Sequence, residues 1–247
     1  AEGEMVLQHD GLVGDADEAG VDCVKLQLKS LDGFYVGDDL TRPPHDAARA
    51  PFRTRGEYVA AREPDAAMLG VVHERCRALG IDWTASVWDA ASVEALRKWD
   101  RPWVKIASAC LSDLALLDRV RSLEIPVVAS TGMSTLEEVD RAYIRLGPER
   151  LLLAHCTASY PCALGDLDLA TIQMMRVRYH VPIGWSSHST DPTIAGLATV
   201  LGAQWIEYHV THDREAWGPD HASSLTYAEL KRAVRAAREA HVAMGTG

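Results

Sequence analysis

Short apolar runs alternate with longer amphipathic stretches along nearly the whole chain. The cores of the short runs are almost continuously apolar, as expected for strands that are buried on both faces of a parallel sheet. The predicted strands are Met5-Val6-Leu7, Cys23–Gln27, Asp82–Ser86, Val104–Ser108, Pro126–Thr131, Leu151–Cys156, Pro182–Ser186 and Trp205–Val210. Between them, apolar residues recur with helical spacing over Glu57–Leu79, Ala91–Trp99, Leu111–Leu123, Thr135–Leu146, Leu169–Tyr179, Thr193–Leu201 and Tyr227–Met244.

Eight strands with interleaved helices in about 250 residues predict an α/β fold of the (β/α)8 TIM barrel type. The alternative, a doubly wound open sheet, usually carries a glycine-rich phosphate loop, and neither of the two common phosphate-loop motifs occurs here. We therefore expect a single catalytic barrel domain over residues 1–247. Its N-terminal region should be irregular, because too few residues separate Gly11 from the strand at Cys23 for an ordinary first helix. The polar, proline-bearing segment 32–55 should form an elaborated loop over one barrel end.

Composition narrows the class of protein without naming its chemistry. A hydrophobic content of 47% and a charged content of 24% are ordinary for a soluble globular protein. We expect neither a membrane span nor a signal peptide, because no apolar run approaches roughly 18 residues. The net charge of -10 argues against a nucleic-acid partner, so a local cluster must hold any anionic substrate. The five cysteines include no CxxC pair, which indicates reduced thiols and a cytoplasmic location.

Polar side chains lie at or near the carboxyl ends of most predicted strands, where a barrel enzyme builds its active site. Two of them, Lys25 and Lys105, lie within apolar strands, and lysine is rarely buried without an anionic partner. Two interpretations stay open. Each lysine is paired with a core carboxylate, or the two ammonium groups converge on a phosphate or carboxylate, with the hydroxyls of Ser108 and Ser130 completing the cradle.

Histidines end the last two predicted strands. His188 lies in the hydroxyl-rich stretch GWSSHSTDP, and His209 ends the next strand. Neighbouring strand ends lie about 5 Å apart, so both imidazoles can reach one divalent ion and leave positions open for a substrate. Each histidine alone would more often be a hydrogen-bonded core residue, but together they favour a metal site for manganese, iron, zinc or cobalt. Asp220, in the loop WGPDHAS, is a candidate oxygen ligand or base.

Several motifs occur in a fixed order: GVDCVKLQ, VKIAS, ASTGMSTLEEV, LLLAHCTASYP, GWSSHSTDPTIAGLATVLGAQWIEYHVTHD and GPDHASSL. With them the chain resembles the sialic acid synthase (N-acetylneuraminate synthase) family over roughly residues 21–245. The resemblance implies a TIM-barrel transferase that condenses phosphoenolpyruvate with an N-acylated amino-sugar aldehyde, typically N-acetylmannosamine. The product is a 2-keto-3-deoxy sugar acid of the kind made in sialic acid and other carbohydrate biosynthesis, and phosphate is released.

The resemblance also assigns residues by motif. It places phosphoenolpyruvate on Lys25, Ser86, Lys105, Ser108, Ser130, Tyr160 and Ser186. It places the divalent metal, usually Mn²⁺ with Mg²⁺, Co²⁺ or Zn²⁺ as alternatives, on His188 and His209. Asp220 corresponds to an acid on the acceptor side, and Glu2 to the glutamate of the first strand. The implied chemistry is attack of phosphoenolpyruvate C3 on a metal-polarised aldehyde, with Asp220 or Glu2 handling protons.

The departures from the family pattern bear mainly on the acceptor. Cys110 replaces a glutamate, Ser187 an aspartate and Ala158 an asparagine, and the family's C-terminal antifreeze-like domain has no counterpart. That domain is what implies a homodimer in the family, so a homodimer is expected here by analogy alone. The acceptor is therefore left open between an N-acetylmannosamine-like sugar and a legionaminic, pseudaminic or secondary-metabolite precursor. A third possibility is a barrel that binds phosphorylated ligands without catalysis.

Overall fold

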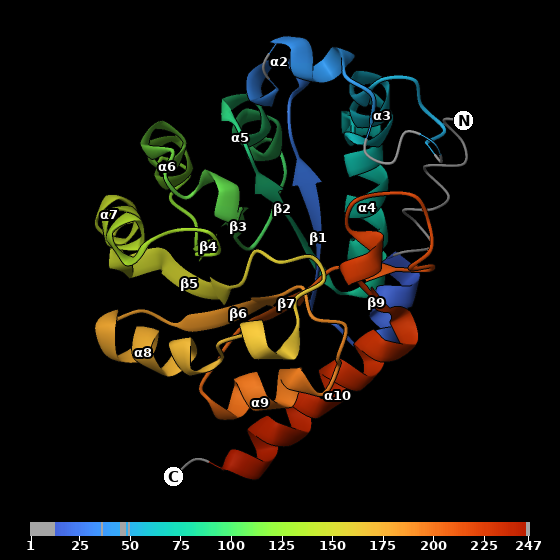
Figure 1. The fold of residues 1–247 in the computed structure, drawn as a ribbon. Coiled ribbons are helices and arrows are strands. Elements are labelled where there is room, and N and C mark those ends of the chain that lie inside the picture. Colours follow the sequence, from blue (N-terminus) through green and yellow to red (C-terminus); the bar gives the residue numbers. More distant parts are fainter. Residues whose placement is uncertain (1–12, 36, 45–47, 49, 246–247) are drawn as a thin grey trace.

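The computed structural model describes residues 13–35, 37–44, 48 and 50–245. Seven parallel strands pair in sequence order to form a strongly curled sheet, with helices packed outside it (Figure 1). The strands are β1 (Cys23–Leu28), β2 (Asp82–Val87), β3 (Val104–Ile106), β4 (Val127–Ser130), β5 (Leu151–Cys156), β6 (Ile183–Ser187) and β7 (Ile206–Tyr208). This α/β arrangement confirms the predicted TIM-barrel-like fold. The first predicted strand, Met5-Val6-Leu7, lies outside the described residues.

All the predicted helices are present, and all but the last have shifted ends. They are α3 (Arg55–Arg62), α4 (Ala66–Leu79), α5 (Ala90–Arg97), α6 (Leu114–Arg121), α7 (Leu136–Leu146), α8 (Ala170–Arg178), α9 (Ile194–Val200) and α10 (Tyr227–Met244). The predicted helix Glu57–Leu79 is two helices, because Pro64 interrupts it and the Asp65 carboxylate accepts a 2.8 Å hydrogen bond from Met68 N as the N-cap of α4.

Short elements complete the chain. The segment after β1 holds the one-turn helix α2 (Leu31–Phe34) and a 3₁₀ helix, Gly37–Thr41. Further 3₁₀ helices span Ser108–Cys110, Pro148–Arg150, Leu164–Asp166 and His221–Ser223. No helix among the described residues is both long enough and apolar enough to cross a membrane.

The expectation that no helix precedes β1 is wrong. Residues 13–19 are helical, and Val13, Ala16 and Ala19 on one side of this helix are buried. Their spacing of three is that of a helix face, and two of the three side chains are alanines, so the helix packs closely. The chain then turns at Gly20, which has a φ of 81°, and enters β1 within a few residues.

The last predicted strand, Trp205–Val210, is broken. Its first part is β7, which pairs with β6, whereas Val210 and Thr211 form β8 and pair with β9 (Leu225–Thr226). His209 lies at the break, and its carbonyl oxygen accepts a 2.9 Å hydrogen bond from Leu225 N. The chain therefore leaves the main sheet at the residue that was predicted to bind metal.

The two faces of the strands differ in chemistry. In β3, Val104 and Ile106 are fully buried in the apolar core between sheet and helices, and Lys105 between them points to the opposite face. Large core side chains such as Leu117 and Ile172 belong to the helices that cover the outside. The inside of the curl is consequently where buried polar side chains gather.

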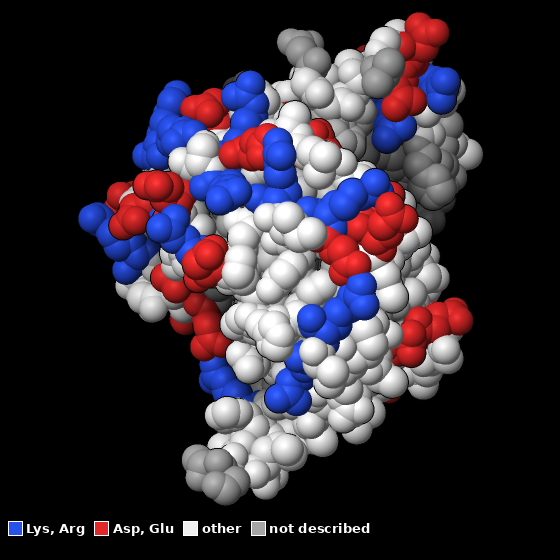
Figure 2. All heavy atoms as spheres, turned by 90° about the vertical axis from the view of Figure 1, so that its left-hand side faces the viewer, with Lys and Arg blue, Asp and Glu red and all other residues white. Residues whose placement is uncertain are grey.

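The outer face of α6, α7 and α8 carries charges of both signs. Figure 2 shows lysine and arginine side chains interspersed with aspartate and glutamate on this face. Arg145 forms an ion pair with Asp118 and Arg178 one with Asp140, so neighbouring helices are linked across the surface. A face of mixed sign of this kind is typical of a solvated surface and unlike a nucleic-acid interface.

Gly184 in β6 provides a test of how tightly the sheet is packed. A Cβ at this position would lie 2.9 Å from the backbone oxygen of Trp205 and 3.0 Å from the Leu152 side chain. We expect Gly184→Ala to lower the free energy of unfolding by about 1–3 kcal/mol, measured by urea denaturation, because backbone cannot move aside cheaply. Gly165→Ala is the control, since a Cβ there meets no described atom within 4 Å. Equal stability of the two variants would contradict this packing.

Candidate active site

A buried carboxylate joins the two strand lysines. Glu207 of β7 is 9% exposed, and its Oε1 lies 3.0 Å from Lys25 Nζ of β1. Its Oε2 contacts Lys105 Nζ of β3, which is 6% exposed. Side chains from the first, third and seventh described strands therefore meet inside the curl. Both lysines have the core carboxylate that the first interpretation of the sequence required. Both also converge on one point, as the second interpretation required.

The cluster has an excess of positive charge. Burial opposes ionisation of Glu207, but Lys105 and then Lys25 hold the pKa of this carboxyl below its usual range. Burial also lowers the pKa of Lys105; Glu207 opposes this shift and Lys25 adds to it. Two ammonium groups share one carboxylate in a site shielded from water, so the three side chains carry one net positive charge when all are ionised. Such a site attracts an anion more strongly than the same charges would on the surface.

Serine hydroxyls surround the cluster. Lys25 Nζ donates a 3.0 Å hydrogen bond to Ser86 Oγ, and Lys105 Nζ donates a 3.3 Å bond to Ser186 Oγ. Ser130 is 1% exposed, and its Oγ has no hydrogen-bond partner within the described part of the chain. A buried hydroxyl without a partner is rare in folded proteins, and a bound ligand would satisfy it.

Gly132 has no side chain, and this leaves space beside these hydroxyls. A Cβ at Gly132 would lie 3.1 Å from both Ser108 Oγ and Cys156 Sγ. Ser108 follows β3, Gly132 follows β4 and Cys156 ends β5, so these groups meet at the carboxyl edge of the sheet. The predicted phosphoenolpyruvate residues therefore lie together at one end of the curl.

The two predicted metal ligands lie side by side. The rings of His188 and His209 are stacked, with centroids 5.4 Å apart. The Thr157 carbonyl oxygen lies 2.9 Å from His188 Nδ1, so this nitrogen carries the proton and Nε2 keeps its lone pair. Burial lowers the pKa of His188 and, with Lys25, lowers the pKa of His209 to about 4. Both imidazoles are consequently neutral near pH 7, the form that binds metal.

Two histidines alone do not complete a coordination sphere. Among the described residues, no group of three or more His, Cys, Asp or Glu side chains is placed to hold a metal ion. Asp220, the N-cap of the helix His221–Ser223, is close enough for its charge to raise the pKa of both histidines. The Tyr160 ring lies against His188, with centroids 3.9 Å apart and the ring planes tilted by 36°, and Tyr160 is half exposed. Glu2 lies outside the described residues.

The sequence did not assign a role to Glu207, although the signal was present. Glu207 and His209 are two residues apart in IEYH, and residues at this spacing share one face of a strand. A strand carboxylate on the same face as a candidate metal ligand is a natural partner for a buried lysine. Cys156 was also unassigned, and its register partner in β6 is Ser186.

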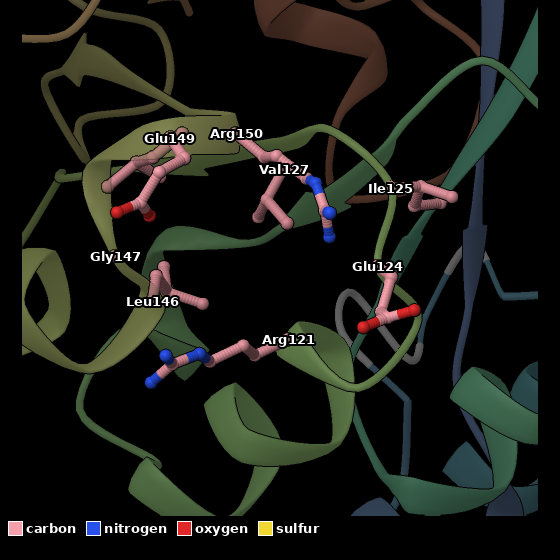
Figure 3. A pocket seen from close by; sticks show the side chains of 9 residues that line it. Arg121, Glu124, Ile125, Val127, Leu146, Gly147, Glu149 and Arg150 are labelled. Atoms are coloured by element: carbon pink, nitrogen blue, oxygen red, sulfur yellow. The ribbon is translucent and has the colours of Figure 1, made fainter.

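A separate hollow lies at the opposite end of the sheet. It has a volume of about 270 Å³ and is lined by Arg121, Glu124, Glu149 and Arg150 around the first residues of β4 and β5 (Figure 3). Two arginines and two glutamates leave this hollow without net charge. The hollow is therefore separate from the cationic cluster inside the curl.

Comparisons with known proteins identify the family of this chain. The family model described as the NeuB family matches residues 12–247. The chain is 34% identical over 224 residues to the N-acetylneuraminate-9-phosphate synthase of Drosophila melanogaster, a match that covers 89% of this chain and 60% of that protein. It is 30% identical to the N,N'-diacetyllegionaminic acid synthase of Legionella pneumophila, over 99% of this chain and 70% of that protein.

Solved structures share the fold. The N-acetylneuraminic acid synthetase of Leptospira borgpetersenii, solved in complex with citrate, superposes with a TM-score of 0.84 at 24% identity, covering 98% of this chain and 81% of that chain. The spore coat polysaccharide biosynthesis protein spsE of Bacillus subtilis gives a TM-score of 0.81 at 28% identity, covering 97% and 65%. The family model spans every described residue, and the chain belongs to the NeuB family.

Proposed function

We propose that this protein is a phosphoenolpyruvate-dependent synthase that joins phosphoenolpyruvate to an N-acylated amino-sugar aldehyde and releases phosphate. The observation that carries the proposal is the convergence of Lys25 and Lys105 on Glu207, with excess positive charge and a buried Ser130 hydroxyl that lacks a described partner. Phosphoenolpyruvate has a carboxylate and a phosphate close together, so it needs cations close together. The names of the relatives, which are sugar acid synthases, support the same reaction class.

Each lysine has a defined task in this scheme. Lys25 and Lys105 neutralise the carboxylate and phosphate of phosphoenolpyruvate, and Glu207 keeps both ammonium groups aimed at the same place. Ser86 and Ser186, already hydrogen-bonded to the lysines, orient the substrate. Because these groups are held by strands, they need little reorganisation when the substrate arrives.

His188 and His209 would hold a divalent metal, with Mn²⁺ as the first candidate. Their neutral rings, and the hydrogen bond that fixes His188 Nδ1, fit this role. When bound, the ion supplies Lewis-acid polarisation to the aldehyde oxygen. The remaining coordination positions would be filled by substrate, water or a group outside the described residues.

The atoms of the reaction balance as follows. A bond forms between C3 of phosphoenolpyruvate and the aldehyde carbon, water adds at C2, and the C2–O bond to phosphate breaks to leave the 2-keto acid. The water loses one proton as it adds, and the aldehyde oxygen gains one. The second water proton leaves the C2 hydroxyl as the ketone forms, and the departing phosphate takes it up. Asp220, whose charge reaches both histidines, is the described residue best placed to exchange these protons.

The cellular setting follows from the same chemistry. All five cysteines are free thiols, which suits the reducing cytoplasm that supplies phosphoenolpyruvate. A homodimer is proposed by analogy with the family. The acceptor could also be a legionaminic or pseudaminic acid precursor, as the name of the Legionella relative suggests. A barrel that only binds phosphorylated ligands would keep the lysine cluster and lack turnover.

The direct test is phosphate release from phosphoenolpyruvate with Mn²⁺, measured against a panel of amino-sugar aldehydes. Acceptor-dependent release would establish the synthase and identify its substrate. Calorimetric binding of phosphoenolpyruvate without release by any acceptor would favour the binding barrel. Absence of binding would overturn the assignment of Lys25 and Lys105.

Removal of one cluster cation should abolish turnover. We expect Lys105→Ala to lower kcat/KM for phosphoenolpyruvate by at least about 100-fold, because it removes a buried ammonium and leaves Glu207 with only Lys25. Lys98→Ala, which removes a lysine at the exposed C-terminus of α5, is the control for net charge. Activity of Lys105→Ala near that of the control would refute the scheme.

The metal-dependent activity should require His188. Dialysis against EDTA should abolish activity, and Mn²⁺ should restore it in the native protein but not in His188→Ala, because one imidazole ligand is missing. Metal content, measured by mass spectrometry after gel filtration, should fall in parallel. His180→Ala changes an exposed histidine and should behave like the native protein. Full Mn²⁺ binding by His188→Ala would exclude His188 as a ligand.

A further inference from the structure

The hollow around the first residues of β4 and β5 combines an apolar base with a charged rim. Val127, Leu146 and Leu151 line it and are buried, with at most 8% of their surface exposed. The two arginines and two glutamates that also line it are exposed. Its volume of about 270 Å³ lies just below the roughly 300–1,000 Å³ of pockets that hold drug-sized ligands, so an occupant must be small.

Opposite charges face this hollow without pairing with one another. Within the described residues, the side chains of Glu124, Glu149 and Arg150 form no hydrogen bond or ion pair. Figure 3 shows Arg150 and Glu124 on one side of the hollow, and Arg121 and Glu149 on the other. A free arginine and a free glutamate on the same side of an apolar base can together bind a ligand that carries both charges.

The two sides of the hollow differ in how freely their charges can act. Arg121 Nη1 donates a 3.0 Å hydrogen bond to the Arg145 carbonyl oxygen. Glu149 Oε2 lies close to Gly147, since a Cβ at that glycine would be 2.8 Å from it. No contact of this kind holds the Arg150 guanidinium within the described part of the chain. The side with Arg150 is therefore the one whose charges are available.

The backbone at Glu124 is strained. Its φ of 56° lies in the left-handed region, which glycine adopts far more readily than glutamate. Glu124 belongs to the turn between α6 and β4, where its backbone N donates a 3.1 Å hydrogen bond to the Arg121 carbonyl oxygen. The turn thus carries a carboxylate where glycine would fold more easily. Strained residues of this kind gather at binding sites, where the side chain has a task.

We propose that this hollow binds a free α-amino acid with a branched aliphatic side chain, whose carboxylate pairs with Arg150 and whose ammonium group pairs with Glu124. A guanidinium group binds a carboxylate through two parallel hydrogen bonds. Both charged groups of an α-amino acid are attached to one carbon, so an arginine and a glutamate on one side of the hollow can take both. The aliphatic side chain covers the apolar base. Two arginines and two glutamates sum to zero charge, which suits a zwitterion better than an anion.

The test is isothermal titration calorimetry of the native protein with L-leucine, 4-methylpentanoate and L-leucinamide. The two analogues keep the aliphatic chain, and lack the ammonium group and the carboxylate respectively. We expect leucine to bind with one-to-one stoichiometry and each analogue to bind at least about 10-fold more weakly, because one charged contact is lost. If leucine does not bind, or if either analogue binds as tightly as leucine, the inference is overturned.

Two substitutions locate the ligand. Arg150→Met and Glu124→Gly should each lower the affinity for leucine at least about 10-fold. Glu124→Gly also relieves the left-handed backbone, so it should unfold at a temperature no lower than the native protein, which separates lost binding from lost folding. Arg119→Met, on an exposed position of α6 outside the lining, is the matched control and should bind leucine like the native protein. Native affinity in either Arg150→Met or Glu124→Gly overturns the inference.

A competition experiment distinguishes the hollow from the lysine cluster inside the curl. Lys25 and Lys105 could also attract the carboxylate of leucine. Excess phosphoenolpyruvate should leave leucine bound to the native protein, because the hollow and the cluster are separate. Displacement of leucine by phosphoenolpyruvate, with binding retained in Arg150→Met, would place leucine at the cluster and overturn the inference.

Discussion

The shared carboxylate of Glu207 is the interaction on which the rest of the site depends. Removing ammonium and carboxylate groups from water is expensive, and the cost is offset only when opposite charges lie in direct contact. Lys25 and Lys105 therefore require Glu207, and Glu207 can reach both only if the sheet curls until β7 faces β1 and β3. The charge cluster can therefore form only in the curled sheet, and the ion pairs of the cluster in turn stabilise the curl. A flat sheet of the same strands would leave each of the three charges buried alone.

The parallel direction of the strands converts this cluster into a site. Because every strand runs the same way, all carboxyl ends open at one edge, and the loops that follow them meet there. The alternation of side chains sends Val104 and Ile106 to the helices and Lys105 to the inside. The break after β7 adds a further element, since it turns His209 toward His188 instead of continuing the sheet. The cations are consequently carried by strands, and each imidazole belongs to the first residue after a strand.

The sequence predicts what repeats along the chain and misses what depends on detail of packing. Strands buried on both faces are recognised in the sequence by their apolar runs. Once the strands are assigned, Lys25, Lys105, His188 and His209 are identified as polar residues within them or at their ends. Helix 13–19 was missed because its buried face consists of Val13 and small alanines, which give a weak periodic signal. The role of Glu207 was missed because its partners are 182 and 102 residues away, and only closure of the curl brings them together.

The loops at the carboxyl edge, where the acceptor is proposed to bind, could not be predicted from the sequence for a different reason. The inner cluster is built on strands, where the period of two links position in the sequence to direction in space. Tyr160 and Asp220 instead come from loops that follow different strands, and no spacing rule relates them. A change in one of these loops alters what lies above the cluster and leaves the strand lysines where they are. The cluster proposed to bind phosphoenolpyruvate and the loops proposed to select the sugar are therefore physically separate, and a change in these loops can leave the buried charges below undisturbed.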